Sequence, residues 1–240
     1  MTADGGLLSF PVGGLAIVVG ASGAIGAALL TRLSGDVRFS RAIGFSRSGT
    51  PALDLTREDT LADAARHILD LGIAPRLIID ATGFLHDADA MPEKSWRQLD
   101  PAQMARAFAI NAIGPALLMK HFLPLLPRAG KSLFVTLSAK VGSIGDNHLG
   151  GWYSYRASKA ALNQFVHTAA IELKRQRPEA ICAALHPGTV TSKLSAPFAK
   201  TGLEVRPAIQ TADQLLCVID TLTSTESGGF FDYRGTPLPW

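Results

Sequence analysis

The sequence predicts a single α/β domain in which helices cover both faces of a doubly wound parallel sheet of about seven strands. Short apolar runs alternate with amphipathic stretches along all 240 residues, the pattern of repeated βα units. Hydrophobic residues make up 47% of the chain and charged residues 18%, which suits one large core. No repeat or linker divides the sequence, so we assign residues 1–240 to one domain, with residues 1–14 as an N-terminal extension.

The expected strands are continuous apolar runs, as is usual when both faces of a sheet are covered. They are Leu15–Val19, Ala42–Phe45, Ala52–Leu53, Leu77–Asp80, Leu133–Leu137, Ile181–Leu185 and Phe230–Tyr233. Helical periodicity predicts helices at Ile25–Ser34, Glu58–Leu71, Gln103–Leu123, Tyr153–Arg177 and Asp213–Thr223. Pro124 and Pro178 follow two of these helices, which fits a residue that cannot continue a helix.

Composition argues against several classes of protein. The net charge of +3 comes from scattered Lys and Arg, and no basic stripe with interleaved aromatics points to nucleic acid. Nothing resembles a secretion signal or a membrane span, so we expect no membrane partner and a cytoplasmic protein. The two cysteines, Cys182 and Cys217, lie in apolar settings and are predicted to be buried free thiols. The six histidines show no metal-ligand spacing, so no metal is expected.

A glycine-rich turn joins the first strand to the first helix. It comprises Gly20, Ala21, Ser22, Gly23, Ala24, Ile25 and Gly26. Free backbone N–H groups and the helix dipole attract a pyrophosphate at such a junction. Because the spacing is GxxGxxG, the turn alone is equally compatible with simple strand–helix packing.

The end of the second strand indicates which dinucleotide would bind. An acidic residue there would hold the ribose of NAD, but this chain has Ser46, Arg47 and Ser48. Arg47 can pair with a 2′-phosphate and Ser46 can donate a hydrogen bond to it. NADP(H) is therefore favoured and NAD(H) is the alternative. If Arg47 has no functional role, it is a solvent-facing loop residue. Asp54 and Leu55 are expected to frame the adenine.

Tyr155 and Lys159 carry the predicted chemistry. Residues four apart lie on one face of a helix, so the ammonium and the phenol can project into one cleft. A nearby cation favours the phenolate and moves the pKa of the phenol toward neutrality, which suits a general acid/base. An isolated pair of this kind is usually a surface feature, so the other motifs decide the interpretation.

Several motifs in a fixed order resemble the short-chain dehydrogenase/reductase family. They are Gly20–Gly26, then Asp80, Ala81, Thr82 and Gly83 in place of Asn-Asn-Ala-Gly, then Asn111, Leu137-Ser138, Tyr155 with Lys159, and Pro187-Gly188-Thr189-Val190-Thr191. Residues 141–147 and 150–153 look most like the C-factor or sniffer-like carbonyl reductases. The resemblance implies a Rossmann-type fold and hydride transfer between NADP(H) and a small carbonyl or alcohol substrate.

The resemblance also implies roles for individual residues. Tyr155 would be the general acid, Lys159 would hold the nicotinamide ribose and lower the pKa of Tyr155, and Asn111, at a kink within its helix, would hold a water. The implied cofactor contacts are Gly20, Ser22, Gly23, Ala24, Ile25, Gly26, Ser46, Arg47, Asp54, Leu55, Ala81, Thr82, Gly83, Asn111, Tyr155, Lys159, Pro187, Gly188, Val190 and Thr191.

The serine that polarises the substrate carbonyl is not settled by the sequence. The family reads Ser-Ser-x-x-Gly after this strand, and the second serine aligns with Ala139. Ser138 is favoured as the catalytic hydroxyl, although strand alternation argues against it, and Ser143 or no serine are the alternatives. Residues 191–210, with Leu194, Pro197 and Phe198, are expected to form a substrate lid. The opposite wall is expected to include Leu85, His86, His148 and Trp152.

Other functions and assemblies stay open at this stage. Ala139 favours a dinucleotide-binding regulator or scaffold with weak turnover, and an NAD-dependent alcohol dehydrogenase is a third reading. The helices Gln103–Leu123 and Tyr153–Arg177 have enough apolar surface to pair, so a homodimer or homotetramer is expected. Trp240 either docks on a core or a neighbouring subunit or belongs to a frayed tail.

Overall fold

A computed structural model describes residues 6–88, 90–191 and 205–240. Its main sheet has six parallel strands in the order β2-β1-β3-β4-β5-β8. The strands are β1 (Gly14–Val19), β2 (Phe39–Phe45), β3 (Pro75–Asp80), β4 (Ser132–Leu137), β5 (Ala180–His186) and β8 (Phe230–Asp232). The chain leaves β1 toward β2 on one side and continues to β3 on the other, so the strand order reverses at the carboxyl end of β1. Ligands of such sheets bind at that point.

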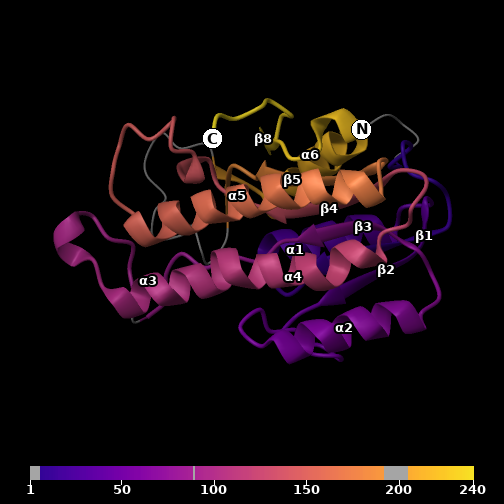
Figure 1. The fold of residues 1–240 in the computed structure, drawn as a ribbon, viewed down its shortest axis with the longest axis horizontal. Helices are drawn as coiled ribbons and strands as arrows, with labels where there is room; N and C mark the ends of the chain where they lie inside the picture. Colours follow the sequence, from indigo (N-terminus) through magenta and orange to yellow (C-terminus); the bar gives the residue numbers. More distant parts are fainter. Residues whose placement is uncertain (1–5, 89, 192–204) are drawn as a thin grey trace.

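Helices cover both faces of the sheet, as predicted (Figure 1). They are α1 (Ala24–Ser34), α2 (Glu58–Asp70), α3 (Pro101–Phe108), α4 (Gly114–Phe122), α5 (Tyr153–Gln176) and α6 (Ala208–Thr221). Neighbouring residues of β1 point to opposite faces. Ile17 therefore joins the core under α2, α4 and α5, while Val18 joins the core under α1 and α6. The Rossmann-type fold predicted from the sequence is confirmed.

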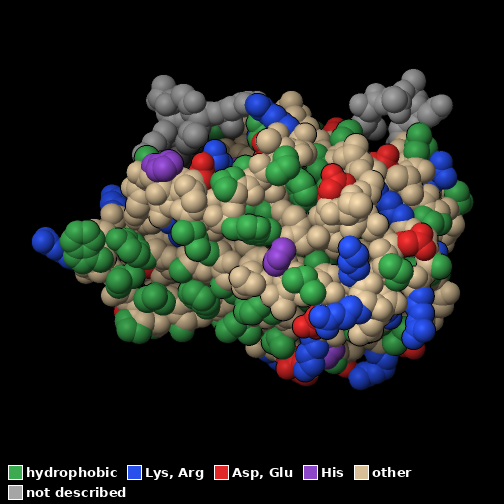
Figure 2. Space-filling view, turned by 45° about the horizontal axis from the view of Figure 1, so that its top comes forward, with side chains coloured by type: hydrophobic (Ala, Val, Ile, Leu, Met, Phe, Trp, Pro, Cys, Tyr) green, Lys and Arg blue, Asp and Glu red, His purple; other side chains and the backbone are tan. Residues whose placement is uncertain are grey.

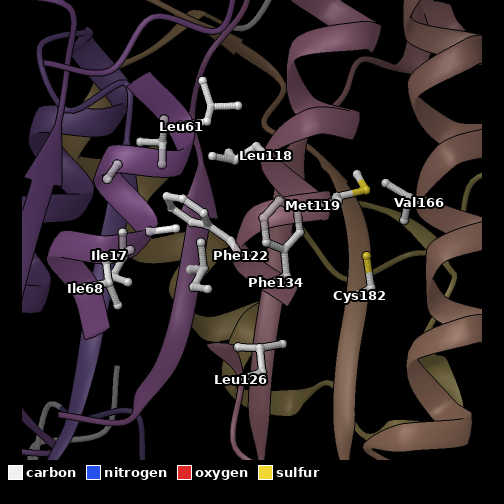
Figure 3. Packing of buried hydrophobic residues seen from close by; sticks show 14 of the residues in the cluster. Ile17, Leu61, Ile68, Leu118, Met119, Phe122, Leu126, Phe134, Val166 and Cys182 are labelled. Atoms are coloured by element: carbon white, nitrogen blue, oxygen red, sulfur yellow. The ribbon is translucent and has the colours of Figure 1, made fainter. Parts of the chain in front are cut away.

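The larger core is built from fully buried aliphatic and aromatic side chains (Figure 3). Leu61 and Ile68 of α2 face Phe122 of α4, and Phe134 of β4 lies beneath. Val166 packs from α5 on the other side of α4. Because each helix is held through such contacts, α5 has a fixed position above β4 and β5.

The helix predicted over Gln103–Leu123 is interrupted by a π-helical turn, Ala109–Ile113, between α3 and α4. A π-turn adds a residue to the turn and often lies at a functional site. By length and composition alone, the run Pro101–Leu125 could span a membrane, with 39% of its most apolar window buried. In this structure the run covers the central strands between α2 and α5 (Figure 1).

Two predicted elements need correction. Ala52–Leu53 is not a strand, because the N–H of Leu53 returns to the carbonyl of Ser46 in a turn instead of joining a ladder. The helix α6 begins at Ala208 and not at Asp213. A separate pair of short strands, β6 (Thr189–Val190) and β7 (Val205–Arg206), was not predicted. Most of the expected lid, residues 192–204 with Leu194, Pro197 and Phe198, lies outside the described residues.

Two further expectations concern side-chain environments. Cys182 is buried as predicted, but Cys217 is exposed, because it lies on the outer side of α6 while Leu215 and Val218 face the core. Trp240 docks on the core: its ring stacks on Phe230 at 6.0 Å between centroids. Its backbone oxygen accepts from the N–H of Gly145 at 2.8 Å. The C-terminal segment is therefore tied to the loop that follows β4.

Candidate active site

Tyr155 and Lys159 lie one turn apart at the start of α5. The Lys159 side chain is 2% exposed, and its Nζ donates to the carbonyl of Leu137, at the end of β4, at 2.7 Å. Burial lowers the pKa of Lys159 to about 8, against an opposing effect of the Asp80 carboxylate. Burial also raises the pKa of Tyr155 to about 12. The sequence predicts a lowered pKa for Tyr155. That direction is wrong, because the burial of the phenol could not be foreseen from its spacing to Lys159.

Asn111 occupies the centre of the π-turn and is fully buried. Its amide forms two hydrogen bonds with the backbone of Phe84: Oδ1 accepts from the N–H and Nδ2 donates to the carbonyl, both at 2.7 Å. Nδ2 also reaches Ser158 Oγ at 3.1 Å. A Cβ built on Gly83 would lie 3.9 Å from both Asn111 Oδ1 and Lys159 Nζ. The strand-end glycine, the kink amide and the lysine therefore converge.

Asp80, at the end of β3, is fully buried beneath this cluster. Its Oδ1 accepts from the N–H of Thr82 at 3.1 Å and from the Thr82 hydroxyl at 2.5 Å. Its Oδ2 accepts from the hydroxyl of Thr136 on β4 at 2.8 Å. Burial raises the pKa of Asp80, although these bonds and Lys159 act against the rise. The carboxylate thus shapes the loop of Ala81, Thr82 and Gly83 from below.

The glycine-rich turn has the geometry of a phosphate site. Gly20 has a φ of +82°, and the N–H groups of Gly20 and Ala21 both donate to the carbonyl of Phe45 on β2. A Cβ on Gly26 would collide with the carbonyl of Gly20, so the turn can press against α1 only with glycine there. Gly23 precedes α1 without a side-chain cap, and the first turn holds no acidic residue. The first-turn amides of Ala24, Ile25 and Gly26 therefore suit an anion, and Ser22 lies in the same turn.

The loop after β2 forms a second corner of this site. The carbonyl of Ser46 accepts from the N–H groups of Gly49 and Leu53, and Arg47 is exposed at the tip. Hydrogen bonds from Thr56 hold the pKa of Asp54 below its ordinary value, and the Arg47 charge acts in the same direction. Arg47, Asp54 and the buried Leu55 lie on one loop between β2 and α2, whereas the sequence placed a strand at Ala52–Leu53 between them.

The candidate catalytic serines both have partners within the protein. The Ser138 hydroxyl donates to Asn163 Oδ1 at 2.6 Å. Ser143 Oγ donates to the backbone oxygen of Trp240 at 3.3 Å and accepts from the N–H of Asp146 at 3.1 Å. Asn163 follows Lys159 by one helical turn, so Ser138 lies beside the same face of α5.

The segment from Pro187 to Thr191 is supported by residues that sequence reasoning missed. Thr189 and Val190 pair with β7, and the N–H of Thr191 donates to the carbonyl of Arg206 at 2.9 Å. The Arg206 guanidinium, 4% exposed, lies 3.3 Å from the centroid of the Tyr233 ring and donates to Gln214. It packs directly against Gly188. No local pattern singles out Arg206, because all these partners are distant in sequence.

The expected cleft wall is partly assembled. Trp152 stands immediately before α5, with a φ of +53° and its ring edge-on to Tyr155 at 6.2 Å between centroids. Leu85 is buried, whereas His148 is exposed. His86 is half-buried in the loop after β3. Among the described residues, Trp152 is the expected wall residue whose ring contacts Tyr155.

Comparison with known proteins assigns the family. The model of a family described as enoyl-(acyl carrier protein) reductase matches residues 37–212. C-signal of Myxococcus xanthus is 40% identical over 143 residues, which cover 59% of this chain and 81% of that protein. The 1-hydroxy-2-glutathionyl-2-methyl-3-butene dehydrogenase of Rhodococcus sp. is 33% identical over 190 residues, covering 79% of each chain.

A solved structure agrees with the fold. The NADPH-bound carbonyl reductase from chicken fatty liver superposes with a TM-score of 0.82 at 22% identity, covering 99% of this chain and 98% of that one. At that identity the match shows the fold alone, whereas the family match and the dehydrogenase relative extend over most of the sequence. The resemblance predicted from the motifs is confirmed, and the chain belongs to the short-chain dehydrogenase/reductase family of oxidoreductases.

Proposed function

We propose that this protein transfers a hydride between NADP(H) and a small carbonyl or alcohol substrate, with Tyr155 as the general acid/base. One observation carries the proposal: Lys159, Asn111 and Gly83 converge one helical turn from Tyr155, at the end of β3 and β4. The strand order reverses beside the glycine-rich turn, where a dinucleotide binds in sheets of this kind. The proposed dinucleotide site and the proposed acid/base site thus both lie at the carboxyl ends of the strands.

The residues present fit a phosphorylated dinucleotide. The uncapped first turn of α1 suits the pyrophosphate, and the exposed Arg47 suits the 2′-phosphate. The bound form of the chicken carbonyl reductase contains NADPH, which supports the same choice here. NADP(H) would supply the hydride. The proposed contacts remain those predicted from the sequence, from Gly20 to Thr191, with NAD(H) as the alternative.

The residues proposed for the proton transfer, Tyr155 and Lys159, lie on α5. Because burial holds the pKa of Tyr155 near 12, the phenol carries its proton at neutral pH, as an acid in carbonyl reduction must. Lys159 would hold the ribose and favour the phenolate that forms. Ser138 would donate to the developing alkoxide after its hydroxyl leaves Asn163, and Ser143 would need to leave Trp240.

The test is an absorbance assay at 340 nm with aldehydes, ketones and alcohols in the presence of either nicotinamide cofactor. We expect oxidation of NADPH with at least one carbonyl, and we expect Tyr155→Phe to abolish it while NADPH binding persists. Binding of NADPH without oxidation across the panel would favour the regulator or scaffold. Oxidation of an alcohol with NAD⁺, with no alcohol oxidation by NADP⁺ and no carbonyl reduction by NADPH, would favour the alternative dehydrogenase.

We also propose that the protein is a homodimer or homotetramer that pairs through α4 and α5. A groove of about 330 Å³ runs between these helices, lined by apolar residues with polar residues at its ends. Phe165 of the lining is itself exposed, and Ile113 of the π-turn and Ile171 of α5 are further exposed hydrophobic side chains. Figure 2 shows hydrophobic side chains over the left and centre of this view, while Lys and Arg gather toward its right side.

We also propose a cytoplasmic location, because the free thiols Cys182 and Cys217 fit a reducing compartment.

A further inference from the structure

The helix that carries Tyr155 begins without a cap of its own. Trp152 precedes the first residue, Tyr153, and provides no side-chain hydrogen bond to the helix. Gly150, Gly151 and Trp152 all have positive φ, so the chain enters α5 through a left-handed turn. For a tryptophan this conformation is strained and persists only where neighbouring contacts enforce it. The first-turn N–H groups also need acceptors from elsewhere in the fold.

Glu93 supplies those acceptors. It lies 61 positions before Ser154, in the connection between β3 and α3, and is 2% exposed. Its Oε2 accepts from the N–H of Ser154 at 3.2 Å, and its Oε1 accepts from the Ser154 hydroxyl. Its backbone oxygen accepts from the N–H of Trp152 at 2.5 Å. Glu93 therefore binds both Trp152, immediately before α5, and Ser154, in its first turn.

The segment that carries Glu93 is itself anchored. The carbonyl of Met91 accepts from the Gln103 side chain at 2.8 Å, and the N–H of Lys94 donates to the Gln98 side chain at 2.7 Å. The Gln103 bond connects the segment to α3, which packs beside α5 (Figure 1), and the Gln98 bond connects it to the 3-10 turn Trp96–Gln98. Gly151 fits closely against it, since a Cβ there would lie 3.3 Å from the Glu93 carbonyl. Glu93 thus belongs to a rigid support and is not a mobile surface acid.

A carboxylate is well suited to this position. The N-terminus of a helix carries a partial positive charge, which compensates a buried negative group. A charge-assisted bond to backbone N–H is stronger than a bond from a neutral acceptor. Tyr155 is the third residue of the same first turn, so a small rotation of that turn would displace its hydroxyl.

We propose that Glu93 is a positioning residue, which fixes the first turn of α5 and through it the Tyr155 hydroxyl and the Trp152 ring. This inference rests on the proposed function of Tyr155 as acid/base. Glu93 does not touch the reacting atoms. Its effect falls mainly on the rate of the proton step, because most proposed NADPH contacts, including the glycine-rich turn and Arg47, lie on other elements, and Lys159 lies beyond the first turn of α5.

The kinetic test compares Glu93→Ala, Glu93→Gln and Ser154→Ala with the unchanged protein. Misplacement of the acid should lower kcat for carbonyl reduction about 10- to 100-fold in Glu93→Ala. The Kd for NADPH should stay within about twofold, since Tyr155 is the only proposed contact in the first turn of α5. Glu93→Gln should fall between, because its amide oxygen can accept from the Ser154 N–H and its NH₂ can donate to the Ser154 hydroxyl, while the charge of the carboxylate is lost. The losses in the double variant Glu93→Ala/Ser154→Ala should be less than additive, because both changes remove the same bond.

Hydrogen exchange measured by mass spectrometry provides a readout that needs no turnover. Peptides covering residues 150–160 should exchange faster in Glu93→Ala and Glu93→Gln, while the rest of α5 stays protected. The matched control is Glu226→Ala, because Glu226 accepts from the N–H of Thr223 in a helix cap away from Glu93 and α3. It should speed exchange at residues 222–228 and leave kcat unchanged. If Glu93→Ala does not fold, Ser154→Ala and Glu93→Gln carry both measurements.

The outcomes separate the two proposals. A folded Glu93→Ala with unchanged kcat, or with unchanged exchange at residues 150–160, overturns the positioning role. If the unchanged protein reduces no carbonyl, the proposed function fails, and the exchange experiment alone decides whether Glu93 fixes the start of α5.

Discussion

At Lys159 the proposed catalytic role conflicts with stability. Its ammonium is buried, with the Leu137 carbonyl as acceptor and the Asp80 carboxylate nearby. The pKa of the amine is about 8 in the folded chain and 10.5 as the ordinary value. Folding with the charged form therefore costs about 3 kcal/mol at neutral pH. An apolar side chain of similar length avoids that cost.

We therefore expect Lys159→Met to be more stable than the unchanged protein at pH 7, although inactive. Between pH 8 and 10.5 the unfolded chain holds a proton that the folded chain has released, so the unchanged protein gains stability as pH rises. The difference in free energy of unfolding should shrink over this range and disappear near its upper end. Urea denaturation at pH 7 and pH 10.5 measures it, and a difference that is constant with pH contradicts the assignment.

Arg47 decides the proposed choice of dinucleotide. Arg47→Ala should weaken NADPH binding about 10- to 100-fold, because a charged hydrogen-bonding pair with the 2′-phosphate is lost. The affinity for NADH should change little. Arg41→Ala is the matched control, since Arg41 is an exposed arginine on β2, six positions before Arg47. Calorimetric titration with both cofactors provides the affinities, and equal losses for NADPH and NADH would rule out this role.

At the residue scale, the sequence predicted side chains that belong to contiguous motifs and missed those that act across the fold. Tyr155, Lys159 and Asn111 lie in one structural cluster, as expected. Glu93 and Arg206 were missed, because their partners are distant in sequence and neither stands in a recognisable pattern. The direction of the Tyr155 pKa was wrong for a related reason, since burial depends on the whole surrounding structure.

At the scale of elements, the π-turn between α3 and α4 brings Asn111 to the site. Asn111→Leu should lower the free energy of unfolding by about 2–3 kcal/mol, because the backbone N–H and carbonyl of Phe84 lose their partner inside the protein. Leu69→Ala, at an exposed position of α2, should change it by less than about 0.5 kcal/mol. Urea denaturation compares the two, and equal effects would mean that the Phe84 bonds do not support the turn.

The elements themselves were predicted well where apolar runs were long. The core strands β1, β3, β4 and β5 lie within two residues of their expected bounds, because burial on both faces leaves a continuous apolar signal. Ala52–Leu53 was wrong, because two apolar residues do not distinguish a strand from a turn. The start of α6 was placed late, since its first turn contains few residues of clear periodicity.

At the scale of the whole molecule, the order of βα units was enough to predict two helical layers around a parallel sheet. The sequence did not predict how many copies associate. If α4 and α5 form the proposed interface, Phe165→Glu should convert the assembly to smaller species, because a charge would replace a half-exposed aromatic beside the groove. Analytical ultracentrifugation reports the mass. Val37→Glu is the control, as Val37 is exposed in the loop after α1.

The contrast between the two cysteines has a practical consequence. Cys182 lies inside the larger core, where burial raises the pKa of its thiol to about 12, whereas Cys217 faces solvent on α6. A maleimide dye should therefore attach at a single known position without mutagenesis. Because α6 and α5 cover opposite faces of the sheet, the fluorophore would lie on the face opposite Tyr155. It would report on cofactor binding without obstructing the proposed cleft.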